Sequence, residues 1–590
     1  MDCRAGRVPM HGTRARQPCG RPPVRQPQRD TSRRFSSTCA NAPIFPGRNP
    51  ALRFEHSTLP AMSRTIPTGL LAGLLWAAAF CFYPEWTLVR WFIGMTGLTL
   101  LLSLWSGERA FRNPRAAAAG SFAFGLCAFS AGCYWIYHSV RIVNGGPVAL
   151  AIALVVLLAA VMGCWYALGG YWAARMQPKR PWMALLFVLP CVLVLTEWLR
   201  GWVFTGFPWL SAGYLTAPVF AGRIPAMLAS LGGMYLVGLT TAWLAGACLL
   251  VWRIAPGPAT RAVGLLLLLG GAAGLGQIAL PAQDGQSRGQ LQARLVQGGI
   301  PQERKWLEEE FVPTLDRYER LSFGQPMRGD SRGPALIVWP EVAVPRTQDS
   351  VRDYLDEMNR LLGDRRIALA LGILTDTDAG RFNSLVVLGN GRGTYHKHHL
   401  VPFGEFFPVP DAIRDWLLGM NLPASDLVPG PAGQAPLTAG EAVCGVSICY
   451  EAAFGSEQRR WAPTAEVLIN VSNDGWFGDT VALEQHLDMA RVRAMETGRY
   501  LLRATGTGIT AAVDPGGRII DRLPKYGPGF LDVSVPRLVG ATPYVRYGEW
   551  PVVVLCILLG IALPAAVRIR EGGSRPKVGR AAFTASEERE

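Results

Sequence analysis

Three side chains in the second half of the chain, a carboxylate, an ammonium and a thiol, have the chemistry of covalent catalysis. They are Glu341, Lys397 and Cys449, and each stands at or just beyond the end of a short apolar run. A thiol at a strand–helix turn becomes a reactive nucleophile when a lysine and acids lie near it. The three positions therefore predict a nucleophilic site, provided that the fold brings the ends of these runs together.

Each of these residues also has an ordinary explanation. A glutamate at a strand end is most often exposed, and a single cysteine is usually a small core hydrophobe. Lys397 stands between His396 and the pair His398-His399, a run that is also compatible with a basic loop. Adjacent histidines rarely converge on one ion without a supporting carboxylate pattern, so we expect no metal.

A further polar run, Asn470-Val471-Ser472-Asn473-Asp474-Gly475-Trp476-Phe477-Gly478, combines turn-forming residues with aromatic ones. Its polar residues can form a turn and one wall of a pocket. Asn473 and Trp476 are therefore candidates for substrate binding. The aromatic residues are equally compatible with a simple cap on the core.

The elements that must position these residues alternate between strands and helices. Strand-like runs are 293–297, 335–339, 367–374, 384–388, 443–448, 467–471 and 508–513. Amphipathic, helix-like runs are 303–322, 350–362 and 482–499. Several strands end in a polar or reactive residue, which is where α/β folds place their sites. The second half of the chain is therefore predicted to be an α/β sandwich.

The chain as a whole is too apolar for an ordinary soluble protein. Of its 590 residues, 50% are hydrophobic and only 17% are charged, against roughly 25% charged in an average soluble chain. Eight apolar stretches each come near the roughly 20 residues that a membrane-spanning helix needs. They lie at about 66–83, 87–105, 117–138, 147–173, 182–199, 226–252, 262–281 and 550–568. Seven such stretches in succession predict a polytopic membrane domain.

The net charge of +15 follows the apolar segments. Residues 282–547 hold 28 Lys+Arg against 32 Asp+Glu, whereas a nucleic-acid-binding domain concentrates basic residues, so we expect no nucleic-acid partner. Basic residues gather in the alternate loops 106–115, 174–181 and 253–261 and after residue 568. By the positive-inside rule, both termini are cytoplasmic, and 282–547 lies on the far side, the periplasm in a bacterium.

This topology divides the chain into five parts. They are an extension (1–61), a seven-helix membrane domain (62–281), an external catalytic domain (282–547), an eighth membrane helix (548–570) and a cytoplasmic tail (571–590). The extension is rich in Arg, Pro and Ser without an apolar period, so we expect it to be disordered and basic. Translation from Met62 would omit it, and a transit peptide is a less favoured explanation.

One pair of charges is expected at the depth or the edge of the membrane. Glu197 and Arg200 are three residues apart and can pair on one helix face. An aromatic loop with little charge, 201–214, follows them. The pattern slightly favours a snorkelling ion pair beside an interfacial aromatic belt. The alternative is one wall of a lipid-facing site beneath the external domain.

The motifs together resemble a known family. Glu341, Lys397 and Cys449, in that order, resemble the Glu-Lys-Cys triad of the nitrilase (carbon–nitrogen hydrolase) superfamily. More specific are the runs Lys397-His398-His399-Leu400-Val401-Pro402-Phe403-Gly404-Glu405, Cys449-Tyr450-Glu451 and the one that begins at Asn470. Because a multi-span membrane half is present as well, residues 62–570 resemble the apolipoprotein N-acyltransferases. The segment 296–306, which ends in Trp306, resembles the start of that family's catalytic domain.

The resemblance implies an α-β-β-α sandwich and a role for each site residue. Cys449 is the nucleophile, Glu341 the general base, and Lys397 the charge that stabilises the oxyanion. The charge of Lys397 should also favour the thiolate. The supporting and substrate-binding residues are Glu405, Tyr450, Glu451, Trp306, Asn473 and Trp476. Among them, Glu405 supports Lys397 or the intermediate, and Trp306 lines the path of the acyl chain.

The same resemblance implies a two-step reaction, the last in bacterial lipoprotein maturation. A phospholipid, typically phosphatidylethanolamine, gives its sn-1 acyl chain to the thiol. The thioester then acylates the α-amino group of an apolipoprotein's N-terminal diacylglyceryl-cysteine. We expect a monomer in the inner membrane that needs no cofactor. Loops with Phe406-Phe407 and Trp416-Leu417-Leu418 could gate lipid access or simply anchor on the membrane surface.

Three other functions are partly compatible with the sequence. A membrane-tethered amidase of the nitrilase type shares the three residues but uses water as the acceptor. A transporter with an external binding domain predicts buried charges in several spans, and mainly Glu197 and Arg200 are found. A purely structural anchor would leave Cys449 dispensable.

Overall fold

The computed structural model describes residues 59–573 except for 83, 144, 279–285, 328–332 and 407–426. The predicted extension lies outside these residues up to residue 58, and the predicted tail lies outside them from residue 574. Phe407 and the run Trp416-Leu417-Leu418, two parts of the predicted gating loops, also lie outside them.

Each of the eight apolar stretches is mostly helical within its described residues. Seven helical segments are long and apolar enough to cross a membrane. They are α1 (Leu59–Cys81), α2 (Thr87–Trp105), α6 (Val148–Met176), the segment Pro181–Arg200 that ends in α8 (Leu189–Arg200), α10 (Ile224–Ile254), α11 (Pro258–Gly276) and the segment Trp550–Arg568 that begins with α18 (Trp550–Ile557). The remaining stretch is bent by 49° between α4 (Pro114–Gly132) and α5 (Trp135–His138). The prediction of a multi-span helical domain is confirmed, with one span broken.

Glycines allow α1, α4 and α6 to approach one another closely. A Cβ atom at Gly69 of α1 would lie 2.0 Å from the carbonyl oxygen of Gly120 on α4. A Cβ atom at Gly125 of α4 would lie 2.6 Å from Cα of Gly163 on α6. Small residues are the usual means by which membrane helices bring their backbones into contact. These contacts fix α6 against the bundle, and α6 forms part of the site described below.

The second half of the chain contains two sheets, each of seven strands among the described residues. One sheet has the order β14-β1-β2-β4-β5-β7, with β3 paired to β4, and the other has the order β13-β12-β11-β10-β9-β8-β6. The first comprises β1 (Gln286–Gln297), β2 (Leu336–Val338), β3 (Val344–Thr347), β4 (Ala368–Thr377), β5 (Gly380–Gly389), β7 (Thr394–His396) and β14 (Gly529–Val539). The second comprises β6 (Gly391–Arg392), β8 (Leu437–Ala439), β9 (Ala442–Ile448), β10 (Val467–Ser472), β11 (Leu501–Thr505), β12 (Ala511–Val513) and β13 (Ile519–Arg522).

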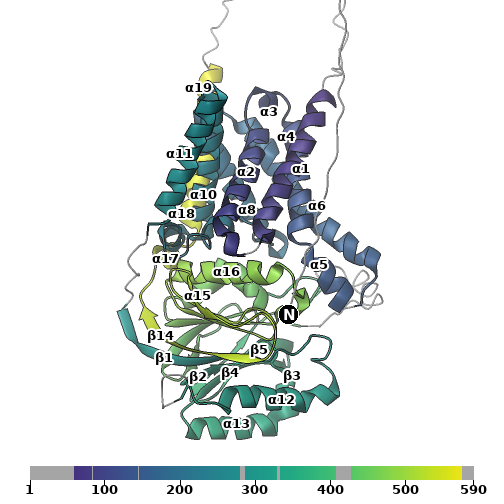
Figure 1. Cartoon of the computed structure of the whole chain (residues 1–590), viewed down its shortest axis with the longest axis vertical. Helices are drawn as coiled ribbons and strands as arrows, with labels where there is room; N and C mark the ends of the chain where they lie inside the picture. Colours follow the sequence, from purple (N-terminus) through teal and green to yellow (C-terminus); the bar gives the residue numbers. More distant parts are fainter. Residues whose placement is uncertain are drawn as a thin grey trace, which may run out of the picture. The chain divides into compact units, whose positions relative to one another are not determined.

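The two sheets pack face to face between two layers of helices. Val338 of β2 and Val446 of β9 belong to the same buried apolar cluster, which fills the space between the sheets. On the outer face of the first sheet lie α12 (Glu308–Phe323) and α13 (Arg352–Asp364), as Figure 1 shows. On the second sheet lie α15 (Gly455–Trp461) and α16 (Ala482–Thr497). The predicted α-β-β-α sandwich is confirmed.

The predicted strands are all present, but β14, with eleven residues, and β11, with five, were not predicted. The pattern of β14 is interrupted by Asp532 and Pro536, which its position at the sheet edge tolerates. The pattern of β11 is interrupted by Arg503, which is fully buried there because Asn470 and Asp474 accept its hydrogen bonds. In both strands tertiary partners override the apolar alternation that predicts a strand.

Helix α16 joins the sandwich to the membrane helices through Gln485. Its Oε1 accepts hydrogen bonds from Trp135 Nε1 at 3.2 Å and from Trp209 Nε1 at 3.1 Å. Its Nε2 donates to the carbonyl oxygens of Gly132 at 3.0 Å and Phe80 at 3.4 Å. One side chain of the sandwich therefore binds three separate segments of the membrane domain.

A second contact of α16 caps a broken membrane helix. The backbone of α10 leaves the helical region at Gly232 and Gly233, and Gly233 has a φ of 69° that suits glycine. A break leaves amide donors without helical partners. Glu496 Oε1 accepts a hydrogen bond from the backbone N–H of Met234 at 2.8 Å. The acid on α16 thus satisfies the amide just beyond the break.

Candidate functional site

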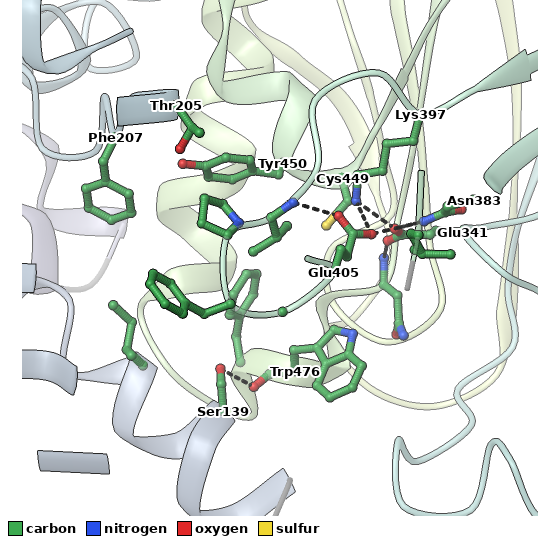
Figure 2. A pocket seen from close by; sticks show the side chains of 18 of the residues that line it. Ser139, Thr205, Phe207, Glu341, Asn383, Lys397, Glu405, Cys449, Tyr450 and Trp476 are labelled. Carbon is green, nitrogen blue, oxygen red and sulfur yellow. Dashed lines mark hydrogen bonds and ion pairs between the residues drawn. The ribbon is translucent and has the colours of Figure 1, made fainter. Parts of the chain in front are cut away.

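The ends of β2, β7 and β9 meet at one cavity. Glu341 follows β2 after two residues, and Lys397 and Cys449 directly follow β7 and β9. All three line a cavity of about 1310 Å³. Figure 2 shows their side chains close together at one end of it. The structure therefore brings together the three residues that the sequence singles out.

Cys449 stands in a strained backbone turn. Its φ of 53° is in the left-handed region, which for a residue other than glycine costs about 1–3 kcal/mol and requires support from its surroundings. The carbonyl oxygen of Cys449 accepts a hydrogen bond from His486 Nε2 at 3.0 Å. The preceding amide, that of Ile448, donates to Glu451 Oε2 at 2.7 Å. The turn is thus held on both sides of the thiol.

The carboxylate of Glu341 is fully engaged by hydrogen-bond donors. Oε1 accepts from Asn383 Nδ2 at 2.7 Å and lies 3.2 Å from Lys397 Nζ. Oε2 accepts from the backbone N–H of Asn473 at 2.7 Å. Three donors, one in β5 and two just beyond the ends of β7 and β10, therefore fix the orientation of the carboxylate.

Lys397 lies between two carboxylates. Its Nζ is 2.8 Å from Glu405 Oε1 and 3.2 Å from Glu341 Oε1 (Figure 2). The other oxygen of Glu405 accepts from the backbone N–H of Val401 at 2.7 Å. Glu405 therefore supports Lys397 directly and ties it to the loop that begins at β7.

Burial and charge act in opposite directions on these groups. Burial alone would raise the pKa of Glu341, but Lys397 and the Asn383 amide outweigh it and hold that pKa below its usual value. Burial alone would lower the pKa of Lys397, but Glu341 and Glu405 raise it. Burial raises the pKa of Cys449 well above its usual value, Glu341 adds to this, and Lys397 opposes it. The resting state is an ion pair beside a neutral thiol.

Lys397 lowers the pKa of the Cys449 thiol, as expected, but not by enough to produce a resting thiolate. Burial of Cys449 is the larger effect, since the charged form loses its hydration in the cavity. A thiol in this state needs a base to take its proton at the moment of attack. The ionised carboxylate of Glu341 is suited to that task.

The other end of the cavity is walled by the membrane domain. Its lining residues there are Leu154, Leu157, Leu158, Val161, Met162 and Trp165 of α6, with Val203, Phe204, Thr205, Gly206, Phe207 and Trp209 of the loop after α8. Leu157 is 58% exposed and Val161 is 40% exposed, so these side chains also face outward. An apolar path therefore runs from the outer surface of α6 to Cys449.

Glu197 and Arg200 do not form the snorkelling pair that the sequence slightly favours. Both are almost fully buried, at 1% and 0% exposure. Arg200 donates to the Phe207 carbonyl and to Ser211 Oγ, and Glu197 accepts from the backbone N–H of Ala212. These bonds hold the loop that forms one wall of the cavity. The position of Glu197 and Arg200 therefore agrees with the alternative interpretation, a wall of a lipid-facing site.

The predicted supporting residues divide into two groups. Those that line the cavity are Glu405, Tyr450, Trp306, Asn473 and Trp476. The phenol of Tyr450 also donates to the Gly206 carbonyl at 2.8 Å, so it links the site to the membrane loop. Glu451 lies behind the nucleophile instead and is fully buried. Its Oε1 accepts from Tyr395 OH and from the amides of His398 and His399.

Three residues at the site were not among the predicted ones. Asn383 binds both Glu341 and Glu405, His486 binds the Cys449 carbonyl, and Lys305 donates to the Glu341 carbonyl at 3.1 Å. A polar residue inside an apolar strand is a signal for Asn383. His486 is hidden because α16 is buried on nearly all sides, so no polar face distinguishes it.

Comparisons with known proteins agree with this geometry. Residues 292–544 match the family described as Carbon-nitrogen hydrolase, and residues 72–247 match the Apolipoprotein N-acyltransferase N-terminal domain. The apolipoprotein N-acyltransferase of Pseudomonas putida is 36% identical over 466 residues, which span 77% of this chain and 89% of the relative. That of Shewanella oneidensis is 33% identical over 505 residues, 82% of this chain and 92% of the relative.

Among solved structures, an amidase from Nesterenkonia sp. is 19% identical with a TM-score of 0.29, and the match covers 45% of this chain and 96% of that one. The curated relatives, in contrast, match across both the membrane helices and the sandwich. The match of residues 72–247 to the Apolipoprotein N-acyltransferase N-terminal domain favours the acyltransferase over the amidase alternative. The chain therefore belongs to the apolipoprotein N-acyltransferase family.

Proposed function

We propose that this N-acyltransferase carries an acyl group from a phospholipid on Cys449 and delivers it to the N-terminal amine of a diacylglyceryl apolipoprotein. The observation that carries the proposal is a single cavity, which joins Cys449 and Glu341 to the outward-facing apolar side chains of α6. An acyl chain in such a cavity stays out of water, at a gain of about 0.8 kcal/mol per CH₂. The site therefore suits a substrate that is anchored in a bilayer.

In the first half-reaction, Glu341 takes the thiol proton as Cys449 attacks the carbonyl carbon of an acyl ester. The Sγ–C bond forms, and the carbonyl electron pair moves to the oxygen, whose charge Lys397 stabilises. Collapse of this intermediate breaks the ester C–O bond. The leaving alkoxide takes the proton from Glu341 and departs as a lysophospholipid.

In the second half-reaction, the α-amine of the apolipoprotein attacks the thioester. Glu341 accepts a proton from the attacking nitrogen, the C–Sγ bond breaks, and the leaving Cys449 thiolate takes that proton from Glu341. Glu405 keeps Lys397 in place through both halves, since its carboxylate lies 2.8 Å from Nζ. The products are an amide and the free thiol, so the enzyme is ready for another donor.

The test of this route is mass spectrometry of the purified protein after incubation with phosphatidylethanolamine alone. We expect an acyl adduct on Cys449, and none in Cys449→Ser. Cys444→Ala is the matched control, because Cys444 is a buried free thiol of the same strand. Full acyl transfer without any adduct would overturn the thioester route. An adduct that water removes as fast as an added amine does would favour the amidase alternative.

The chain is a membrane-bound bacterial enzyme, and we propose its finer placement from the loop charges. Both termini lie in the cytoplasm, and the enzyme acts as a monomer in the inner membrane. The catalytic domain, 282–547, is periplasmic. It follows the membrane domain, 62–281, and precedes the eighth helix, 548–570. A membrane-impermeant maleimide should label Asp378→Cys in cells with a permeable outer membrane, but label Arg109→Cys only after lysis. The reverse pattern would invert the topology.

A further inference from the structure

Lys305 is a second buried ammonium at the reaction centre. It lies in the segment between β1 and α12, is only 6% exposed, and lines the same cavity as Glu341, Lys397 and Cys449. Its Nζ donates a hydrogen bond to the backbone carbonyl oxygen of Glu341 at 3.1 Å. The carboxylate of Glu341 is turned the other way, toward Lys397.

The two ammonium groups differ in their partners. Lys397 binds the carboxylates of Glu341 and Glu405, which occupy two of the three N–H donors of an ammonium. Lys305 binds one carbonyl, and within the described residues no carboxylate forms an ion pair with it. Glu341 acts on the charge of Lys305 without a direct ion pair, and a buried charge with no directly bonded counter-ion is unfavourable. Lys305 is therefore better explained by a negative charge that arises during turnover than by stability of the resting fold.

The charges of the centre point to the same conclusion. Glu341, Glu405 and Lys397 together carry one negative charge, and Lys305 balances it. Transfer of the proton from Cys449 to Glu341 moves one negative charge from the carboxylate to the sulfur. The net charge of the whole centre, with Cys449 included, is therefore unchanged. When the electron pair of the substrate carbonyl moves to its oxygen, the free donors of Lys305 and the third donor of Lys397 are charged donors that the described residues place on the cavity wall with Cys449.

We propose that Lys305 is a catalytic residue whose ammonium binds the oxygen that becomes negative when Cys449 attacks the acyl carbonyl. The inference rests on the proposed thioester route. The Sγ–C bond forms, the thiol proton goes to Glu341, and the carbonyl π pair becomes the oxyanion held by Lys305. When the tetrahedral intermediate collapses, the electron pair returns to the carbonyl bond and the bond from the acyl carbon to the glycerol oxygen breaks. The proton on Glu341 then goes to that oxygen.

The ionisation of Lys305 is consistent with this role. Burial lowers its pKa to about 8, although the nearby Glu341 and Cys449 act in the raising direction. The other charged groups of the centre, Lys397 and Glu405, are joined to Glu341. Since only the protonated amine stabilises an oxyanion, the rate of acyl-enzyme formation should fall as pH rises through about 8.

Two reactions of Cys449 separate this role from a structural one. Acylation by a phospholipid passes through an oxyanion, whereas alkylation by iodoacetamide needs the thiolate but forms no oxyanion. In Lys305→Met we expect acylation to slow by about 10²-fold or more, the usual effect of losing one oxyanion donor. Alkylation should slow by less than about tenfold. Arg304→Met is the matched control, because Arg304 is exposed and pairs with Glu310.

Lys305→Arg provides a second measurement, because arginine stays protonated at all accessible pH values. It should restore part of the acylation rate and remove the fall above pH 8. Equal losses of acylation and alkylation in Lys305→Met would show that Lys305 only shapes the Glu341 turn, and unchanged acylation would exclude any role. If wild-type protein forms no acyl adduct at all, the thioester route fails instead, and the two failures are thus distinguishable.

Discussion

The carbonyl oxygen of Cys449 accepts a hydrogen bond from His486 Nε2 at 3.0 Å. The other ring nitrogen of His486 lies 3.0 Å from Asp474 Oδ1, and Asp474 Oδ2 accepts from Arg503 at 2.7 Å. All these side chains are buried. Because the next residue along α16 toward the N-terminus is Gln485, the same helix turn holds the nucleophile and the membrane helices.

His486→Leu tests whether this chain of bonds maintains the reactive turn. Loss of the ring leaves the Cys449 carbonyl and Asp474 each short of a partner, which typically costs about 1–3 kcal/mol per group. We expect a lower Tm and a roughly tenfold or greater loss of iodoacetamide reactivity at Cys449. His398→Gln serves as the control, since His398 binds the Gly430 carbonyl instead. Unchanged thiol reactivity in His486→Leu would contradict the assignment.

Much of the fold follows from the sequence because its signals are local. Apolar length marks the membrane helices, and strand ends mark Glu341, Lys397 and Cys449. The ion pair Glu197–Arg200 was assigned to the interface because a sequence shows the spacing of two charges but not what surrounds them. Its place in the wall of the cavity depends on the return path of the loop after α8, which no local pattern encodes.

The site residues that the sequence missed have a common physical cause. Asn383 and His486 act through partners that lie 42 and 37 residues away along the chain. A contact with a partner so far along the chain leaves no local pattern in the sequence. Similarly, the acyl-binding side of the cavity is built from leucines and valines of α6 that resemble any lipid-facing helix. Their role depends on the sandwich that covers them.

Glu341 should remain ionised well into the acid range. Its pKa lies below the ordinary value of 4.5 because its ion pair and hydrogen bonds outweigh burial. A depressed pKa in the folded state stabilises the fold above pH 4.5, and this contribution is lost as pH falls further. We therefore expect acyl-enzyme formation to be insensitive to pH between 5 and 7 and, on the acid side, to fall only below about 4.5.

Removal of the Glu341 carboxylate should slow acyl-enzyme formation more than any change of pH near neutrality. In Glu341→Gln the thiol loses its proton acceptor, and we expect acyl-enzyme formation to slow by about 10²–10⁴-fold. Glu357→Gln, on the exposed part of α13, is the control. A quenched-flow measurement of adduct formation gives the rate. An acid limb near pH 6, or a slow variant that recovers at high pH, would argue for another base.

Gln485→Leu tests the contact between the sandwich and the membrane domain. The change leaves two indole N–H groups and two carbonyl oxygens without their partner. We expect a loss of stability of about 2–4 kcal/mol, since each unsatisfied buried group carries a penalty. Thermal unfolding in detergent is the measurement. Glu484→Gln is the control, because Glu484 faces Arg522 and Lys525 on the outer side, and a Tm equal to that control would reject the role.

Arg200→Met should damage the lipid wall of the cavity while sparing the thiol. Removing one partner of a buried ion pair leaves the other uncompensated, at a cost of about 3–5 kcal/mol, and frees the loop that carries Phe207. We expect acylation by a long-chain phospholipid to fall by about tenfold or more, whereas a short-chain water-soluble ester, which needs little of that wall, loses much less. Arg175→Met, at an exposed position of α6, is the control. If the acylation rates with the two esters fall equally, the ion pair stabilises the whole fold, and the loop does not specifically bind the acyl chain.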